Sequence, residues 1–130
     1  MTGKSSVLVK IPLMKQPKIV YTRSGKVFVL GGTDFADKVV GKCYQIVGTE
    51  IKEIAAMNQP RRSFGCYVTN DHIYVAGGLH SSFSATASCE VYDIERNTWS
   101  ELPSLPSPNF SLALSSFKRK HLIAVGGTDE

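Results

Sequence analysis

The chain has 130 residues, of which 42% are hydrophobic, 9% aromatic and 20% charged. This composition excludes an intrinsically disordered chain, which would need few apolar residues and a high net charge. The longest apolar runs, such as Val27–Leu30, are far shorter than the roughly 18 apolar residues that cross a bilayer as a helix. A single domain with a real core is the expectation at this length.

The formal net charge of +4 is concentrated near the N-terminus. Residues 1–33 contain no acidic residue and six basic ones: Lys4, Lys10, Lys15, Lys18, Arg23 and Lys26. We expect residues 1–16 to form a solvated basic tail that leads into an edge strand, where lysines discourage pairing between molecules. A nucleic-acid-binding tail at residues 1–26 is the less favoured alternative, because the lysines are irregularly spaced and not interleaved with aromatic residues.

The three cysteines, Cys43, Cys66 and Cys89, are odd in number and include no CxxC pair, which disfavours a zinc site. Each lies in an apolar, strand-like run, where a free thiol packs as a small hydrophobe. No signal peptide is evident at the N-terminus. Together these features predict a reducing compartment and a cytoplasmic location, without a membrane segment.

Three Gly-Gly pairs, at 31–32, 77–78 and 126–127, divide the chain at intervals of 46 and 49 residues. Each pair ends a short run rich in β-branched and aromatic residues, and each run follows a polar turn, which predicts strands joined by hairpins. Further similarity extends between the pairs: Tyr44 aligns with Tyr92, and Ile51 with Trp99. One unit is therefore four short strands, repeated with a period near 50.

The predicted strands of the three units are residues 18–22, 27–31, 42–47 and 50–55, then 64–69, 73–77, 88–94 and 98–102, and finally 111–117 and 122–126. One segment has a competing interpretation, because residues 50–57 place apolar side chains on one face of a short helix. Its alignment with the segment around Trp99 favours an outer strand.

The second unit, IYVAGG followed by EVYDIERNTWSELPSLPSP, resembles the kelch repeat in its Gly-Gly pair, its Tyr and its Trp. In the first unit Ile51 replaces the Trp, while Pro60 and Arg61 keep the Pro-Arg pair that precedes the next strand. In the second unit Asn109 replaces that Arg. The resemblance covers residues 17–127 and implies an all-β fold, in which consecutive four-stranded antiparallel blades form part of a kelch-type β-propeller.

Ten strands amount to a blade at 17–57, a blade at 62–104 and a half blade at 110–127, whereas propellers close with about 4–8 blades. The ring is therefore expected to be incomplete. The chain is either a fragment of a longer protein or a subunit whose further blades come from other chains. Each flank is expected to expose apolar residues, which favours self-association; these are Ile19, Val20, Tyr21, Val27, Phe28 and Val29 on one side, and Leu112–Leu114 and Leu122–Val125 on the other.

Candidate catalytic residues fit structural roles better. His72 and His121 occupy equivalent turns in successive units, which is typical of a structural residue. The carboxylates that might be paired for acid–base chemistry are Asp34 with Asp37, and Glu90 with Asp93 and Glu95. We expect no enzymatic activity, no cofactor and no metal. The alternative is a fragment of a propeller enzyme, such as a galactose-oxidase-like oxidase or a sugar epimerase.

Loops are the usual functional surface of a propeller, because its strands are committed to packing. The resemblance implies that two loop sets share one face, namely residues 33–41 and 79–87 after the Gly-Gly pairs, and residues 58–62 and 104–109 before the inner strands. The predicted function is protein–protein interaction, as a scaffold or substrate adaptor. The candidate partner-binding residues are Arg61, Arg62, His80, Phe83 and Asn109.

Arg61 occupies the Pro-Arg position of the repeat, and in substrate-adaptor proteins of the kelch family such arginines hold acidic peptide segments. A guanidinium grips a carboxylate through two parallel hydrogen bonds. An acidic peptide is therefore one expected partner. The equally weighted alternative is that Arg61 pairs with a carboxylate of the neighbouring blade.

Overall fold

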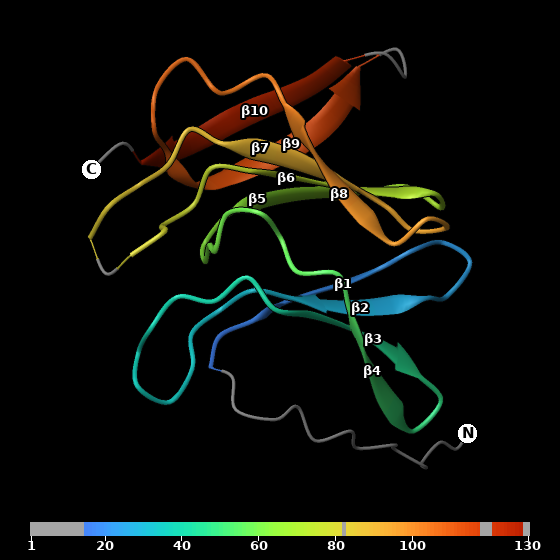
Figure 1. The fold of residues 1–130 in the computed structure, drawn as a ribbon. Coiled ribbons are helices and arrows are strands. Elements are labelled where there is room, and N and C mark those ends of the chain that lie inside the picture. Colours follow the sequence, from blue (N-terminus) through green and yellow to red (C-terminus); the bar gives the residue numbers. More distant parts are fainter. Residues whose placement is uncertain (1–14, 82, 118–120, 129–130) are drawn as a thin grey trace, which may run out of the picture.

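The computed structural model describes residues 15–81, 83–117 and 121–128, and every regular element in these ranges is a β-strand. Two four-stranded antiparallel sheets and one two-stranded sheet follow one another along the chain. Figure 1 shows them stacked in that order, with strands running in similar directions and the described sheets not closed into a ring. The predicted all-β architecture of consecutive blades is confirmed.

The first sheet has the order β1-β2-β3-β4. Its strands are β1 (Lys18–Tyr21), β2 (Val27–Leu30), β3 (Cys43–Val47) and β4 (Glu50–Ile54). β4 pairs with β3 along its whole length, with Ile51 opposite Ile46. The helical interpretation of residues 50–57 is therefore wrong, because this pairing takes up the backbone groups that a helix would have used internally.

The second sheet repeats this arrangement in the order β5-β6-β7-β8. Its strands are β5 (Gly65–Val68), β6 (His72–Ala76), β7 (Cys89–Asp93) and β8 (Thr98–Leu102). The third sheet contains β9 (Phe110–Phe117) and β10 (His121–Thr128), which form one antiparallel pair. Within the described ranges, β10 pairs with β9 alone.

Strand register corrects one alignment between the two complete sheets. Ile51 and Trp99 are equivalent, as predicted, but Tyr92 lies opposite Trp99 whereas Ile46 lies opposite Ile51. The structural counterpart of Tyr92 is therefore Ile46 rather than Tyr44. The reason is turn length, because Val47 pairs with Glu50 across a shorter turn than the one that joins β7 to β8.

The main core lies between the first two sheets. Phe28 and Tyr92 meet edge to face, with ring centroids 6.1 Å apart. The other buried members come from both sheets: Val20, Leu30, Cys43, Ile54, Met57, Phe64, Ile73 and Val75. Burial of these apolar side chains is the dominant force that joins the two blades.

Two side chains of the second sheet also hold the backbone of the first. The Trp99 indole Nε1 donates to the Ala55 carbonyl at 2.8 Å, and the Ala55 amide donates to Asn97 Oδ1 at 2.9 Å. Asn97 Oδ1 also accepts a hydrogen bond from the Tyr92 hydroxyl at 2.6 Å. The Tyr and Trp of the repeat are therefore committed to packing between blades, as their spacing predicted.

The outer face of the first sheet is only partly the open flank that the sequence suggests. Ile19 and Tyr21 are exposed, at 57% and 74%, whereas Val20 and Phe28 are buried against the second sheet. The prediction is wrong for these last two because successive strand residues point to opposite faces. Val29 is also buried. The side chains of Leu112, Ala113 and Leu122–Val125 lie outside the described part of the chain.

The exposed Ile19 and Tyr21 keep self-association as an expectation. Replacing both with lysine should shift the chain toward monomer, because the lysines would place charge on the apolar face. Sedimentation velocity over a range of concentrations measures this shift. Equal sedimentation of the variant and the original chain would exclude this face as the contact.

The glycine pairs have the structural role that their repetition indicates. Gly31 and Gly77 have φ angles of 61° and 66°, and Gly32 and Gly78 have φ angles of 102° and 100°. Residues with a Cβ rarely adopt such angles. The repeat therefore ends each second strand with the same left-handed backbone, which turns the chain into the following loop.

The three cysteines are free, and Cys43 and Cys89 are buried. Burial raises the pKa of both Cys43 and Cys66 to about 12. The neutral thiols therefore favour the folded state below pH 9, and this contribution is lost as the pH rises from 9 toward 12.

Alkylation of Cys43 and Cys66 at pH 8 should be roughly a thousandfold slower in the folded chain than in denaturant, because so little thiolate is present. Mass spectrometry after timed iodoacetamide treatment, with the guanidinium-unfolded chain as the control, measures the ratio. Comparable rates in the two states would contradict this description of the core.

Candidate partner-binding face

The loops after the Gly-Gly pairs and the connections between sheets lie at one end of the stacked strands. In Figure 1 the loop at residues 33–41 and the loop at residues 79–87 project to the left, whereas the hairpin turns within the sheets lie on the right. The connections at residues 55–64 and 103–109 reach the same left side. This end is the candidate partner-binding face.

Backbone hydrogen bonds hold the loop at residues 79–87 between two connections. Leu79 exchanges hydrogen bonds with Arg62, at 2.9 Å and 2.8 Å. On the other side, the Asn109 amide donates to the Thr86 carbonyl at 3.3 Å. The loop closes on itself where the His80 amide donates to the Ser84 carbonyl at 2.9 Å. Arg62 and Asn109 therefore flank the loop that carries His80.

The loop at residues 33–41 closes in the same way. The Asp34 amide donates to the Lys38 carbonyl at 2.9 Å, and Asp34 Oδ1 accepts from the amides of Ala36 and Lys38, both at 2.9 Å. Asp37 pairs with Lys15, with Nζ 2.6 Å from Oδ1. The predicted preference for a structural role of Asp34 and Asp37 is consistent with these local bonds.

The hydrogen bond and the charge of Lys15 lower the pKa of Asp37 below its ordinary value of 3.8. This ion pair favours the folded state above that ordinary pKa, and its contribution is lost as the pH falls through the lowered folded value. NMR titration of the Asp37 side chain should therefore show a midpoint below 3.8. Lys15→Met should restore the ordinary midpoint, whereas Lys38→Met should leave it low; an unchanged midpoint in Lys15→Met would contradict the pairing.

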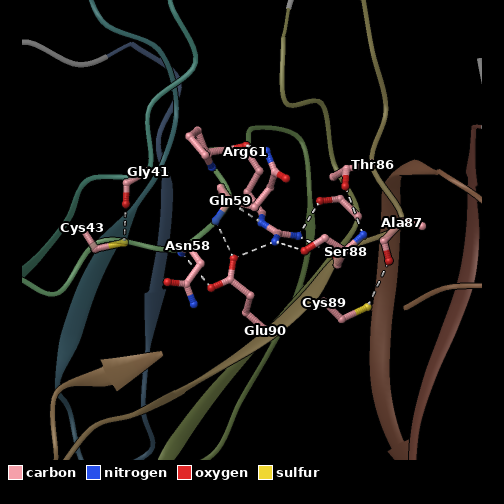
Figure 2. Close-up of polar contacts among 12 residues, drawn as sticks. Gly41, Cys43, Asn58, Gln59, Arg61, Thr86, Ala87, Ser88, Cys89 and Glu90 are labelled. Atoms are coloured by element: carbon pink, nitrogen blue, oxygen red, sulfur yellow. Dashed lines mark hydrogen bonds and ion pairs between the residues drawn. The ribbon is translucent and has the colours of Figure 1, made fainter. Parts of the chain in front are cut away.

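Arg61 lies beneath this face rather than on it, because its side chain is fully buried. Figure 2 shows the guanidinium surrounded by oxygen atoms of the second blade. Nη1 donates to the carbonyls of Gly77 and Ser88, at 2.9 Å and 2.7 Å. Nη2 donates to Ser88 Oγ and to Glu90 Oε2, both at 2.8 Å. Burial lowers the pKa of Arg61, and the charge of Glu90 opposes that shift.

Glu90 is equally buried, and its carboxylate is fully engaged. Besides Arg61, it accepts hydrogen bonds from the backbone amides of Asn58 at 2.8 Å and Gln59 at 2.9 Å. We call the group Asn58, Gln59, Arg61, Ser88 and Glu90 the polar clasp. It fixes the connection at residues 55–64 to strand β7.

The clasp corrects the candidate site in one respect. Arg61 was a candidate partner-binding residue, with a carboxylate of the fold as the alternative, and the structure supports the alternative. A fully buried guanidinium with a complete set of acceptors offers nothing to an external partner. Sequence reasoning missed Glu90 as its partner, although the acidic residue before Tyr92 was visible in the repeat.

The other candidate residues lie at the loop end of the molecule. His80 is exposed, and Phe83 is 92% exposed. Arg62 and Asn109 are half-buried beside them. Phe35, 67% exposed in the loop at residues 33–41, was missed by the sequence analysis. Its position in a loop equivalent to that of Phe83 was the available signal.

His72 lies away from this face, at the hairpin end where β6 begins. Its Nε2 is 4.0 Å from Asp93 Oδ2 on the paired strand. His72 and His80 therefore occupy opposite ends of the second blade. Within the described ranges, no three His, Cys, Asp or Glu side chains gather as a metal-binding group, and no helix there is long and apolar enough to cross a membrane.

Comparisons with known proteins agree with this architecture. The Kelch motif family model matches residues 60–106. Kelch-like protein 41b of Danio rerio is 31% identical over 120 residues, which is 91% of this chain and 20% of that protein. Kelch-like protein 41a of Danio rerio is 36% identical over 92 residues, or 69% of this chain and 15% of that protein.

An F-box/kelch-repeat protein of Arabidopsis thaliana is 37% identical over 68 residues, which is 52% of this chain and 18% of that protein. The chain therefore spans about a fifth or less of the length of these curated relatives. The motif match covers the best-conforming unit, and the Gly-Gly backbone, the four-stranded sheets and the Tyr and Trp contacts repeat around it. This chain is a kelch-repeat protein, and its sheets are successive blades of kelch β-propeller type.

Proposed function

We propose that the chain is a protein-interaction module without catalytic activity, which binds a protein partner through the loop face. The supporting observation is the loop at residues 79–87, which is held by backbone bonds on both sides yet exposes His80 and Phe83. A rigidly held, exposed aromatic side chain loses little conformational entropy on binding, and aromatic residues are enriched in protein interfaces.

The chemistry of the face favours apolar contacts over recognition of an acidic peptide. Phe35 and Phe83 project from equivalent loops of neighbouring blades. Arg61, the main support for an acidic ligand, is committed to Glu90. Arg62 is the remaining arginine of the candidate set, so an acidic segment would add to the contact rather than dominate it.

A scaffold or adaptor role is the wider proposal. Relatives are named Kelch-like and F-box/kelch-repeat proteins, and this chain spans a small part of their length. The division into a basic tail at 1–16, blades at 17–57 and 62–104, and a half blade at 110–127 remains part of the proposal. A cytoplasmic location is also proposed, on the basis of the three free thiols.

A photo-crosslinking residue in place of Phe83 tests the loop face directly. We expect it to capture a protein partner that the same residue at Thr49, an exposed position at the opposite hairpin end, does not capture. Phe83→Ala should then weaken binding of that purified partner by about tenfold or more. Thr49→Ala should leave the affinity unchanged. Capture from both ends, or unchanged affinity of Phe83→Ala, would contradict the proposal.

Metal analysis addresses the enzymatic alternative. A copper oxidase would need tyrosine and histidine ligands that converge on one point. We expect the purified chain to hold less than stoichiometric copper after incubation with the metal and dialysis. Stoichiometric copper would favour the propeller enzyme instead.

A further inference from the structure

The free edge of β10 lies where β6 has a partner. Both strands begin with a histidine, end at a Gly-Gly pair and follow a paired inner strand. β6 pairs with β7 along its other edge, with Val75 opposite Glu90. The corresponding edge of β10 is unpaired within the described ranges. An exposed strand edge offers backbone groups to another extended segment.

The polar clasp shows what such a strand brings in the complete blade. There β7 supplies Glu90, which accepts hydrogen bonds from Asn58, Gln59 and Arg61. Forty-eight residues later in the sequence, the positions of these three donors are occupied by Pro106, Ser107 and Asn109. Pro106 has no backbone N–H, and Asn109 carries no charge.

A carboxylate in this second location would therefore lose one backbone donor and its only cation. Burying an ionised group without its partner is strongly unfavourable. A strand that carries glutamate at the position of Glu90 is thus a poor match for β10. This argument also disfavours a second copy of β7 as the added strand.

Asn109 indicates which chemistry is suitable instead. Its backbone is fixed, because its amide donates to Thr86 and its carbonyl accepts from Gly78 at 2.8 Å. Its side-chain Oδ1 is buried and has no hydrogen-bond partner among the described residues. A buried acceptor without a donor costs free energy that an incoming donor would recover.

We propose that the free edge of β10 binds an extended strand from polypeptide outside these 130 residues, and that this strand places a neutral donor at the position of Glu90. An amide or hydroxyl there donates to Asn109 Oδ1. The site is a strand edge, distinct from the loop face of the proposed function.

Peptides based on β7 test this proposal against the full chain. One peptide copies residues 86–94, and a second carries Glu90→Gln; fluorescence anisotropy measures the affinity of each. The unmodified chain should bind the glutamine peptide at least about fivefold more tightly than the glutamate peptide. Chain variant Asn109→Arg, which restores the cation of the clasp, should reverse this preference.

Two controls separate strand pairing from other binding. A glutamine peptide with proline at both Val91 and Tyr92 should not bind, because one of the two missing N–H groups faces β10. Asn109→Ala, which removes the acceptor without adding charge, should abolish the preference for glutamine over alanine at the Glu90 position. Equal affinity of the glutamine and glutamate peptides for the unmodified chain, or no binding of either at about 1 mM, would overturn the proposal.

Discussion

Replacing Arg61 with alanine is expected to lower the free energy of unfolding by about 3–5 kcal/mol, because Glu90 would remain buried without its cation. This is a large part of the roughly 5–15 kcal/mol that stabilises a typical domain. Urea denaturation followed by fluorescence of Trp99, the single tryptophan, measures the change. Arg96→Ala, at an exposed arginine in the turn between β7 and β8, should change stability by less than about 0.5 kcal/mol.

The double variant Arg61→Met with Glu90→Leu distinguishes the ion pair from simple packing. Removing both charges leaves no buried ion, so the double variant should be more stable than Arg61→Ala. If Arg61→Ala does not fold, the double variant still reports on the pair. A double variant as unstable as the sum of the two single replacements would show that the charges are not coupled.

Gly78→Ala is expected to be the most disruptive single-methyl addition in the second blade. The new Cβ would lie 2.7 Å from the Arg62 carbonyl oxygen and 2.8 Å from Phe64 Cβ. The φ angle of 100° adds a separate penalty of about 1–2 kcal/mol for any residue with a Cβ. Because the obstructing atoms are backbone and core, the crowding should cost about 1–3 kcal/mol more.

Gly25→Ala is the matched control, since Gly25 has a φ angle of 96° and no atom within 4 Å of an added Cβ. It should show the backbone penalty alone. Thermal denaturation of both variants, monitored by circular dichroism, gives the difference. Equal losses of stability would mean that the close approach of the connection to Gly78 contributes nothing.

Much of the fold was predictable because its signals are local. The Gly-Gly pairs have left-handed backbone angles that glycine adopts most easily, so their positions mark the strand ends. Alternating apolar residues and turn residues located all ten strands. The register of β3 was misjudged at Tyr44 because the turn after it is shorter than its counterpart, and the matching tyrosines suggested the opposite.

The candidate site was less predictable, because exposure depends on segments distant in the sequence. His80 and Phe83 lie in a polar loop, and their exposure follows from that setting. Arg61 lies beside Arg62 in the sequence, yet one is buried and the other half-buried. Nothing in the local sequence distinguishes the two arginines.

The sequence by itself determined the repeat, the strands and the loop ends of this protein, since these depend on the preferences of neighbouring residues. Only the tertiary structure decided the role of Arg61. Its acceptors on Gly77, Ser88 and Glu90 lie 16, 27 and 29 residues along the chain. They come together only when β6 and β7 pair and the connection packs across them. A buried charge is tolerated where such partners converge, and that convergence is a property of the folded chain.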